Sequence, residues 1–414
     1  MTILQNMISF NKARDIVSNI GQLGSERISA SKAVDRVLDE DVFCLVDSPP
    51  INSSLKDGFA LRAEDISGAS SESPVCLVVS GTLWAGQKDM LEVRKGQSVR
   101  IMTGARIPKG ADAVLPQEFA SLQADHRLLC LAPTSVGRNI LKKGADVKKG
   151  EPLLEKGTFL TPPLVGLLSG AGVSSVRVVK RPTVAIVATG SELAEEGKID
   201  ESEKIFPSNR ATIYSWLRRY GIEAEALLCK DDPVVLRELL DSCLARFDVV
   251  ITSGGVLDGQ RDLVVSTFQE LGVEFLFQRV KMGPGKGVCM GVKDKRLVFN
   301  LPGGPPSNYV AFMFIALSAI LRLMGQRDKF PSTIKATVEC DVKGREDWTQ
   351  LLLARTRLQR EGFFTTPVFE DSRLKRIAFS DSAIIIPEGV RHVRAGQETH
   401  VALFEMPRIF LNAV

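Results

Sequence analysis

The middle third of the chain alternates short, continuously apolar runs with amphipathic stretches. The predicted strands are 183–188, 225–229, 248–252, 273–280 and 296–300, and the predicted helices are 209–220, 233–246, 262–271 and 307–324. Proline opens one of these helices and glycine closes three of them, as expected at helix ends. Strands and helices that alternate in this way predict a parallel sheet covered by crossover helices, an α/β domain of three layers.

The regions on either side have different patterns. Helical periodicity at 9–20 and 30–38 is followed, from about 51 to 140, by short β-type runs between Gly, Pro, Ser and Asp turns, which predict a β-rich subdomain. After Pro331 the helical period disappears, and short alternating runs predict a small β-barrel. We therefore expect a multidomain α/β protein with an N-terminal mixed region, a central α/β domain and a C-terminal barrel, at 1–181, 182–328 and 329–414.

The composition argues against several classes of protein. The 414 residues carry a net charge of only +4, spread evenly, which argues against nucleic acid as a partner. The seven cysteines include no C-x-x-C pair, which favours a reducing, cytoplasmic setting over a disulfide framework or a zinc site. No signal peptide is apparent, and the longest apolar stretch, 309–321, is shorter than the ~20 residues that span a membrane.

The loops that follow the five predicted strands share one kind of chemistry. In an open parallel sheet, ligands bind beyond the carboxyl ends of the strands. Glycines there allow a phosphate close to the backbone, and helix N-termini present N–H groups to an anion. The residues concerned are Gly190, Glu192, Asp231, Ser253, Gly254, Gly255, Asp262, Gly285, Lys286, Pro302, Gly303 and Pro305.

These loops together predict a crevice that binds a phosphate or a nucleotide. Lys286 supplies a positive charge, and the carboxylates of Glu192, Asp231 and Asp262 are hard oxygen donors suited to Mg²⁺. Each piece alone has a simpler explanation, because a glycine after a strand is commonly a turn and an aspartate at a helix start is commonly an N-cap. The coincidence of five such loops favours the crevice.

The order of these motifs resembles one known family. Within 182–328, the Thr-Gly-x-Glu, Ser-Gly-Gly, Pro-Gly-Lys and Leu-Pro-Gly segments resemble the molybdenum-cofactor biosynthesis domain. The likeness continues outside that domain, so the chain resembles the molybdopterin molybdenumtransferases, the MoeA and gephyrin E-domain family, rather than their single-domain adenylyltransferase relatives. The segments that carry this wider likeness are 50–60, 85–86, 101–104, 108–114, 137–140, 144–147, 161–163 and 207–209.

The resemblance implies a reaction and a set of roles. Such an enzyme binds adenylylated molybdopterin and molybdate, inserts the metal into the dithiolene and releases AMP with the help of Mg²⁺. Asp231 and Glu192 would then serve the nucleotide and the metal, and Asp262 and Lys286 the reacting centre. The β-rich subdomain would reach the crevice from the partner subunit of a homodimer, bringing the side chains Asp57, Thr103 and Asp146.

Further residues follow from the same resemblance. Ser208, Asn209 and Ser307 would join the glycine and proline loops in binding the substrate, and Lys281, Arg345 and Ser372 are candidates for the oxyanion. Taken from the residues alone, Asp57 is equally well a turn aspartate, and Asp146 a solvated ion-pair partner in a lysine-rich loop.

The sequence departs from the family pattern around the predicted anion pocket. Leu257 replaces a serine, a lysine is absent at Gly283, and an arginine is absent at Leu141. Gly287 and Gly304 also differ from the usual residues, and Lys56 replaces a methionine. Since each charge-assisted hydrogen bond is worth about 1.5–3 kcal/mol, such losses weaken oxyanion binding.

These departures leave three hypotheses besides the standard reaction. The enzyme uses another oxyanion such as tungstate, it acts on a related pterin, or it is a paralogue that binds the cofactor or a partner without turnover. A separate alternative is a nucleotidyltransferase that adenylylates molybdopterin. The regions outside the central domain argue against the adenylyltransferase, and the missing Lys and Arg favour the paralogue.

Overall fold

The computed structural model describes residues 7–195, 204–254, 263–327 and 331–404, which form two compact units. The first unit comprises 7–26, 35–37 and 179–404, and the second comprises 27–34 and 38–178. The helix α1 (Phe10–Ser18), capped by the hydroxyl of Ser9, contacts α7 (Leu317–Leu323) of the first unit. Residues 7–26 therefore belong to the first unit, although the sequence boundary at 181 groups them with the N-terminal region.

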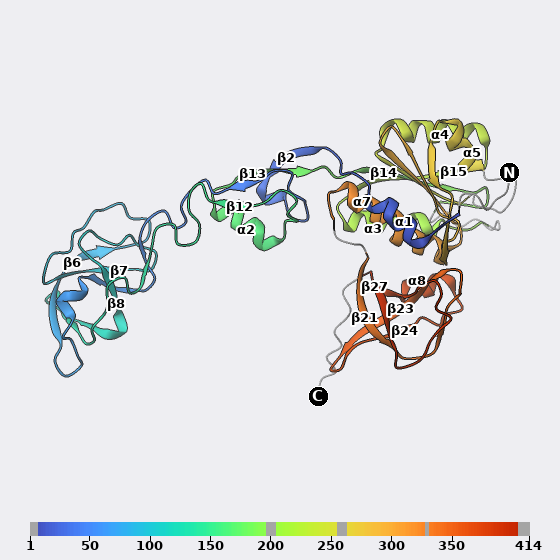
Figure 1. The fold of residues 1–414 in the computed structure, drawn as a ribbon. Helices are drawn as coiled ribbons and strands as arrows, with labels where there is room; N and C mark the ends of the chain where they lie inside the picture. The colour runs from blue at the N-terminus through green and yellow to red at the C-terminus, as the bar shows by residue number, and fades with distance from the viewer. Residues whose placement is uncertain (1–6, 196–203, 255–262, 328–330, 405–414) are drawn as a thin grey trace. The chain divides into compact units, whose positions relative to one another are not determined.

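The α/β domain of the first unit is built on a six-stranded sheet in the order β15-β14-β16-β20-β19-β17 (Figure 1). Four neighbouring strands are parallel, and β19 and β17 run antiparallel at one edge. The bounds are β14 (Thr183–Thr189), β15 (Glu223–Cys229), β16 (Val249–Ser253), β20 (Arg296–Leu301), β19 (Cys289–Lys293) and β17 (Glu274–Phe277).

Helices cover both faces of this sheet, which confirms the three predicted layers. Alternate residues of β14 point to opposite faces: Ile186 packs with the core that includes α1, α3 (Ser208–Arg219) and α7, whereas Val187 packs with α4 (Pro233–Arg246) and α5 (Leu263–Glu270). Figure 1 shows the two helical layers on either side of the strands. The continuously apolar strands follow from this double burial.

The predicted long apolar helix is a core element. It runs from Pro305 to Leu323 as α6 (Pro305–Ala311), a π-helical turn at Phe312–Ala316 and α7. Among the described residues it is the one helix long and apolar enough to cross a membrane. Of its most apolar 18-residue stretch, 83% is buried inside the structure. Its apolar surface is thus accounted for by packing against the sheet and the barrel.

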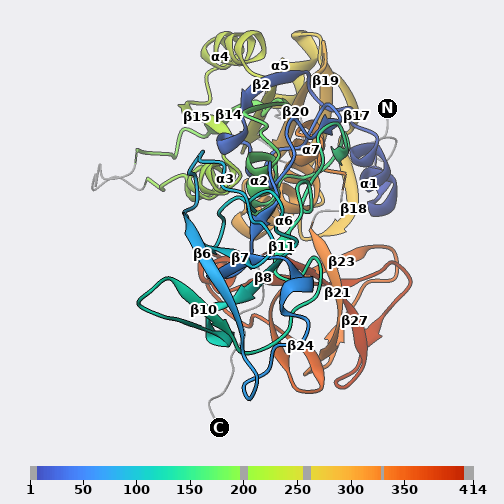
Figure 2. The ribbon, with the colours of Figure 1, turned by 90° about the vertical axis from the view of Figure 1, so that its left-hand side faces the viewer.

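The C-terminal region of the first unit is a closed five-stranded barrel, as predicted. Strand β23 pairs with both β24 and β25, so the order β23-β24-β21-β27-β25 returns to its start. Figure 2 shows these strands grouped apart from the helices of the α/β domain. The bounds are β21 (Ser332–Val338), β23 (Thr349–Gln359), β24 (Gly362–Pro367), β25 (Ser382–Ile386) and β27 (Glu398–Leu403), with α8 (Arg373–Ala378) between β24 and β25.

One predicted strand of the central sheet is wrong. The run 273–280 is divided between the antiparallel edge strand β17 and β18 (Arg279–Gly283), which leaves the sheet and pairs in parallel with β23 and with β1 (Met7–Ser9). The run contained two strands because Gln278 lies between them at the turn from one sheet to the other. The loop with Gly285 and Lys286 therefore follows a strand joined to the barrel.

The second unit contains two packed parts. One is a six-stranded sheet, β8-β5-β7-β6-β10-β9, which confirms a β-rich subdomain within 51–140. The other surrounds α2 (Pro162–Gly170) and includes β2 (Ser25–Ser29), paired with β13 (Ser175–Val179). The helix predicted at 30–38 is wrong: only the 3-10 turn Ala30–Lys32 forms, because Ala30, Ala33 and Leu38 are buried against α2 and the neighbouring strands rather than along one helical face.

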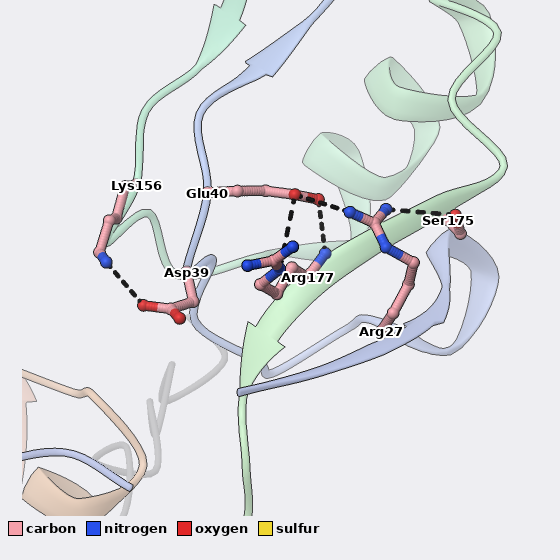
Figure 3. A network of polar contacts seen from close by, with 6 residues as sticks. All are labelled: Arg27, Asp39, Glu40, Lys156, Ser175 and Arg177. Carbon is pink, nitrogen blue, oxygen red and sulfur yellow. Dashed lines mark hydrogen bonds and ion pairs between the residues drawn. The ribbon is translucent and has the colours of Figure 1, made fainter. Parts of the chain in front are cut away.

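A network of ion pairs and hydrogen bonds joins residues near α2 (Figure 3). Glu40 accepts from the guanidinium of Arg27 on β2 at 2.8 Å and from the backbone N–H of Arg177 on β13 at 2.7 Å. Lys156 forms a separate pair with Asp39 at 2.8 Å. These groups are at least partly exposed, so each ion pair contributes little to the free energy of unfolding. Glu40 links β2 to β13, because it contacts a residue of each strand.

Candidate functional site

The carboxyl ends of β14, β15, β16 and β20 lie at one rim of the sheet. Their register places Ala188 beside Ser253, and Ser253 beside Leu301, with Thr189 beside Cys229. Four of the five predicted loops therefore meet at this rim, since parallel strands in register end together.

A cavity of about 500 Å³ opens at this rim. It is lined by the loops after β14, β16 and β20, by the first residues of α3 and α6, and by 372–374 at the start of α8. Its volume is within the usual range for a small-molecule site, roughly 300–1,000 Å³. The predicted residues that line it are Glu192, Ser208, Asn209, Ser253, Gly254, Gly303, Pro305 and Ser372.

The centre of the site is the buried hydroxyl of Ser253. The side-chain amides of Asn209 and Asn308 both donate to its oxygen, at 3.1 and 2.9 Å. Each amide also holds the loop after β20: Asn209 donates to the carbonyl of Gly303 at 2.8 Å, and Asn308 donates to that of Pro302 at 2.9 Å. Two helices and two loops are thereby fixed around one serine. No group in the described part of the chain accepts the proton of this hydroxyl, so it can be donated to a ligand.

Gly254 occupies a position that other residues would not tolerate. Its φ is +115°, and a Cβ added there would lie 2.5 Å from the carbonyl oxygen of Thr189. The glycine therefore lets the β16 loop approach the β14 loop closely. Beside it, the hydroxyl of Thr189 is buried and has no hydrogen-bond partner among the residues that the structure describes.

The positive ends of two helices face the cavity. α3 begins at Ser208 and α6 at Pro305, and the first residues of both line it. Arg210, in the first turn of α3, adds a buried guanidinium to the lining, paired with Glu195 at 3.1 Å. A helix N-terminus carries a partial positive charge, so the cavity favours an anionic ligand. The start of α6 contributes this charge without N–H donors at its first two positions, because Pro305 and Pro306 have no backbone N–H.

The two predicted metal-binding carboxylates lie on neighbouring loops. Asp231 accepts from the backbone N–H of Ser191 at 3.1 Å, and the Ser191 hydroxyl accepts in turn from the N–H of Asp231 at 3.3 Å. This reciprocal pair holds Glu192, which lines the cavity, next to the β15 loop. The described residues contain no cluster of three His, Cys, Asp or Glu side chains. Two carboxylates still fit Mg²⁺, which takes its remaining ligands from phosphate and water.

Other predicted residues lie around the rim without lining the cavity. Gly190 donates its N–H to Cys229 at 3.2 Å, and Pro302 accepts from Asn308. A Cβ on Gly285 would lie 3.3 Å from the carbonyl of Ser307, so the Gly285 loop packs against α6.

The oxyanion candidates are spread over the barrel side of the first unit. The ammonium of Lys286 lies 5.7 Å from the ring centre of Trp348, and Lys281 is 3.8 Å from Glu388. Arg345 is exposed near Trp348, with which it shares a backbone bridge. Ser372 lines the cavity and caps α8 by accepting from Lys375 N–H at 3.3 Å.

At Gly283, where the family pattern has a lysine, the side chain of Gln350 lies close to the backbone. A Cβ at this position would lie 3.0 Å from the side-chain nitrogen of Gln350, which pairs with Gly283 between β18 and β23. The amide of Gln350 therefore borders the space that a longer side chain at 283 would need.

In the second unit, Asp57 and Thr103 form a fixed pair. One carboxylate oxygen of Asp57 accepts from both the backbone N–H and the hydroxyl of Thr103, each at 2.7 Å. These bonds, backbone N–H first, lower the pKa of Asp57, with a smaller contribution from Arg100. Asp146 lies on an exposed loop, where its backbone N–H donates to Ser48 at 2.9 Å.

Three predicted positions lie outside the described residues: Gly255, Asp262 and the altered position Leu257. Two residues of the described site were missed by the prediction, Asn308 and Arg210. The signal for Asn308 is present in the sequence, because Pro-Ser-Asn occurs at both helix starts, at 207–209 and 306–308. Arg210 carried no comparable signal, since its burial is set by the helices that surround it.

Two family profiles match the chain in series. "MoeA N-terminal region (domain I and II)" matches residues 8–172, and "Probable molybdopterin binding domain" matches 185–322. A molybdopterin molybdenumtransferase of Staphylococcus epidermidis is 32% identical over 381 residues, 91% of each chain. The chain belongs to the molybdopterin molybdenumtransferase (MoeA) family.

Other MoeA relatives agree along the whole length. A molybdopterin molybdenumtransferase of Staphylococcus aureus is 30% identical over 94% of both chains. The solved structure of the molybdopterin biosynthesis MoeA protein from Pyrococcus horikosii has a TM-score of 0.81 and 30% identity, covering 97% of this chain and 100% of that one. The resemblance seen in the motifs is therefore confirmed, and the cavity lies in the molybdopterin-binding domain of a MoeA protein.

Proposed function

We propose that this MoeA protein is a molybdopterin molybdenumtransferase of molybdenum cofactor biosynthesis, which inserts the metal of molybdate into adenylylated molybdopterin and releases AMP. The observation that carries the proposal is the cavity at the sheet rim, where Ser253, held by Asn209 and Asn308, faces the positive ends of α3 and α6. That arrangement suits the phosphates of a nucleotide anhydride.

The phosphates would be held by the rim itself. Gly254 brings two loops together without side-chain bulk, so backbone N–H groups and the Ser253 proton reach a phosphate oxygen. Arg210, which is paired with Glu195, adds a guanidinium to the cavity lining at the start of α3 and would attract the phosphate groups. We assign Gly190, Ser208, Gly255, Gly285, Pro302, Gly303, Pro305 and Ser307 to shaping this substrate pocket.

Glu192 and Asp231 would hold Mg²⁺, with Asp262 close to the reacting centre. When bound, Mg²⁺ neutralises phosphate charge and makes AMP a better leaving group. The protein's own contribution is positioning, because the Ser191–Asp231 pair fixes the two loops that carry the carboxylates.

Molybdate would approach from the barrel side. Ser372 offers a hydroxyl in the cavity, and Lys286 and Arg345 supply positive charge near Trp348. With Gln350 beside Gly283 in place of a second lysine, this side is less positive than the family pattern implies. We therefore keep tungstate as a second candidate oxyanion.

The catalytic set would be completed by a partner subunit. The carboxylate of Asp57 is held by two hydrogen bonds from Thr103 on the exposed surface of the second unit, and Asp146 lies on an exposed loop. We propose a homodimer in which these side chains serve the partner's cavity. We also propose a cytoplasmic setting, since all seven cysteines are free thiols.

One assay tests this function. The purified protein is incubated with adenylylated molybdopterin, Mg²⁺ and molybdate or tungstate, and AMP is measured. AMP release that depends on the oxyanion supports the transferase. Consumption of ATP with free molybdopterin would instead indicate the adenylyltransferase, and binding without release of AMP a non-catalytic paralogue.

A further inference from the structure

A second, larger cavity lies beside the rim site, within the same unit. Its volume is about 1310 Å³, and it runs between α3 on one wall and the outer surface of the barrel with α8 on the other. Ser208 and Leu374 line both cavities. We call this second space the α3 groove. Because the two spaces share these residues, one ligand can extend from the rim site into the groove.

Most of the α3 wall of the groove is made of small side chains. Ser208, Ala211, Thr212 and Ser215 recur at helical spacing along it, and Trp216 and Arg219 follow at its far end. The indole of Trp216 is anchored, since it packs partly against the main core and stacks on Tyr220 with ring centres 6.4 Å apart. The guanidinium of Arg219 lies over the same indole, 5.5 Å from its ring centre. The small residues therefore give a flat wall against which a planar group can lie, and the Trp216–Arg219 pair bounds it at one end.

The barrel wall carries a fixed cation, Arg355. Its guanidinium lies 5.4 Å from the ring centre of Phe379, and its Nε donates to the carbonyl of Phe379 at 2.6 Å. Among the described residues no acidic side chain pairs with Arg355. A guanidinium has five N–H donors in a rigid plane, so four of them are left for a ligand in the groove.

The same wall carries a fixed acceptor, Glu339. One of its oxygens accepts from Arg357 and the other from the hydroxyl of Thr366. Burial raises the pKa of Glu339, but these two hydrogen bonds outweigh it and the pKa falls below its ordinary value. Each carboxylate oxygen keeps a second lone pair, so Glu339 can accept two further N–H bonds.

We infer that the α3 groove binds the pterin end of the adenylylated substrate, while the rim site holds its nucleotide and phosphates. This inference rests on the proposed function. The aminopyrimidinone ring of this pterin is planar, and it has an edge of amino and ring N–H donors next to a carbonyl oxygen. Glu339 matches the donor edge, Arg355 matches the carbonyl, and the small residues of α3 leave room for the ring. The rim cavity, at about 500 Å³, suits the nucleotide portion, and the groove provides the space for the rest.

The test compares two ligands on the full-length protein. Binding of adenylylated molybdopterin and of AMP alone is measured by calorimetry for wild type, Glu339→Gln and Arg355→Ala. We expect each variant to bind the full substrate about ten- to a hundred-fold more weakly, as for a lost charge-assisted hydrogen bond, and to bind AMP as wild type does.

Matched controls lie on the other face of the sheet, the face that α4 covers. Arg246 also stacks on an aromatic ring, at 4.9 Å from Phe247, and it pairs with Glu225 at 2.7 Å, outside both cavities. Glu225→Gln and Arg246→Ala repeat the same chemical changes and should leave both affinities unchanged.

A third variant fills the groove instead of removing a contact. Ser215 is exposed on α3, so Ser215→Trp should leave the fold intact and selectively weaken binding of the full substrate. Equal loss of AMP binding, or unchanged binding of the substrate in all three variants, would overturn the inference. So would a change in oligomeric mass by light scattering, because the groove would then be a contact between copies. An enzyme that releases no AMP refutes the proposed function, whereas the groove is judged by the difference between the two affinities.

Discussion

Asn209 and Asn308, which lie in the first turns of two different helices, donate to the same atom, the hydroxyl oxygen of Ser253. The helices are far apart in sequence and adjacent at the sheet rim. Since each amide also holds a carbonyl of the loop after β20, the two asparagines fix both walls of the proposed phosphate site.

Removing the buried amide should cost stability as well as activity. Asn308 is 2% exposed, so Asn308→Ala removes one of the two amide donors to the buried Ser253 hydroxyl and the side-chain donor to the Pro302 carbonyl. We expect a loss of about 1–3 kcal/mol in the free energy of unfolding, measured with urea. Asn209 is less buried, so Asn209→Ala should lower AMP release with a smaller loss of stability. Equal stability losses in the two variants would contradict this reading of the pair.

Two glycines of the site should respond differently to the same change. Gly254 has φ +115° and almost no room for a Cβ, so Gly254→Ala should destabilise the protein by more than about 1 kcal/mol and abolish AMP release. Gly304 has φ −68° and nothing within 4 Å of an added Cβ. Gly304→Ala should therefore change stability by less than about 0.5 kcal/mol, as judged by thermal melting. A stable, active Gly254→Ala protein would show that the close approach of the two loops is dispensable.

The link between Asp231 and Ser191 gives a prediction about magnesium. Asp231→Ala removes both a proposed metal ligand and the acceptor for the Ser191 N–H. AMP release should be lost at ordinary Mg²⁺ concentrations, with the fold intact by circular dichroism. The neighbouring Asp232 caps α4, accepting from Val234 and Val235 N–H, and lies outside the cavity. Asp232→Asn keeps a capping side chain and serves as the control. Full activity of Asp231→Ala at low Mg²⁺ would remove this residue from the site.

The Asp57–Thr103 pair predicts a pH effect. The pKa of Asp57 is lowered in the folded protein, so its hydrogen bonds stabilise the fold above the unfolded pKa, about 3.9, and this contribution is lost as pH falls through the folded pKa. Thr103→Val removes the hydroxyl donor and keeps the backbone N–H. The pKa of Asp57 should rise, by carboxyl NMR, and the acid limb of the activity profile should move to higher pH. An unmoved Asp57 titration would show that the hydroxyl bond is absent in solution.

Local patterns in the sequence determined most of the architecture. The strands β14, β16 and β20 were predictable because burial on both faces requires a continuous apolar run, and α4 because Pro233 opens it and Arg246 ends an apolar period. The barrel strands were predictable from their alternation, since one face is buried and the other exposed. Glycine-rich loops at parallel strand ends likewise predicted the rim site, because strand direction alone brings those ends together.

Tertiary structure decided what local pattern could not. The run 273–280 is uniformly β-type, and only pairing with β19 on one side and β23 on the other divides it between two sheets. That division places Lys286 near Trp348 rather than at a strand end of the central sheet. The meeting of Asn209 and Asn308 on Ser253, and of α3 with Arg355 and Glu339 across the groove, likewise joins residues far apart in sequence. Such contacts depend on how whole elements pack, and no local period encodes them.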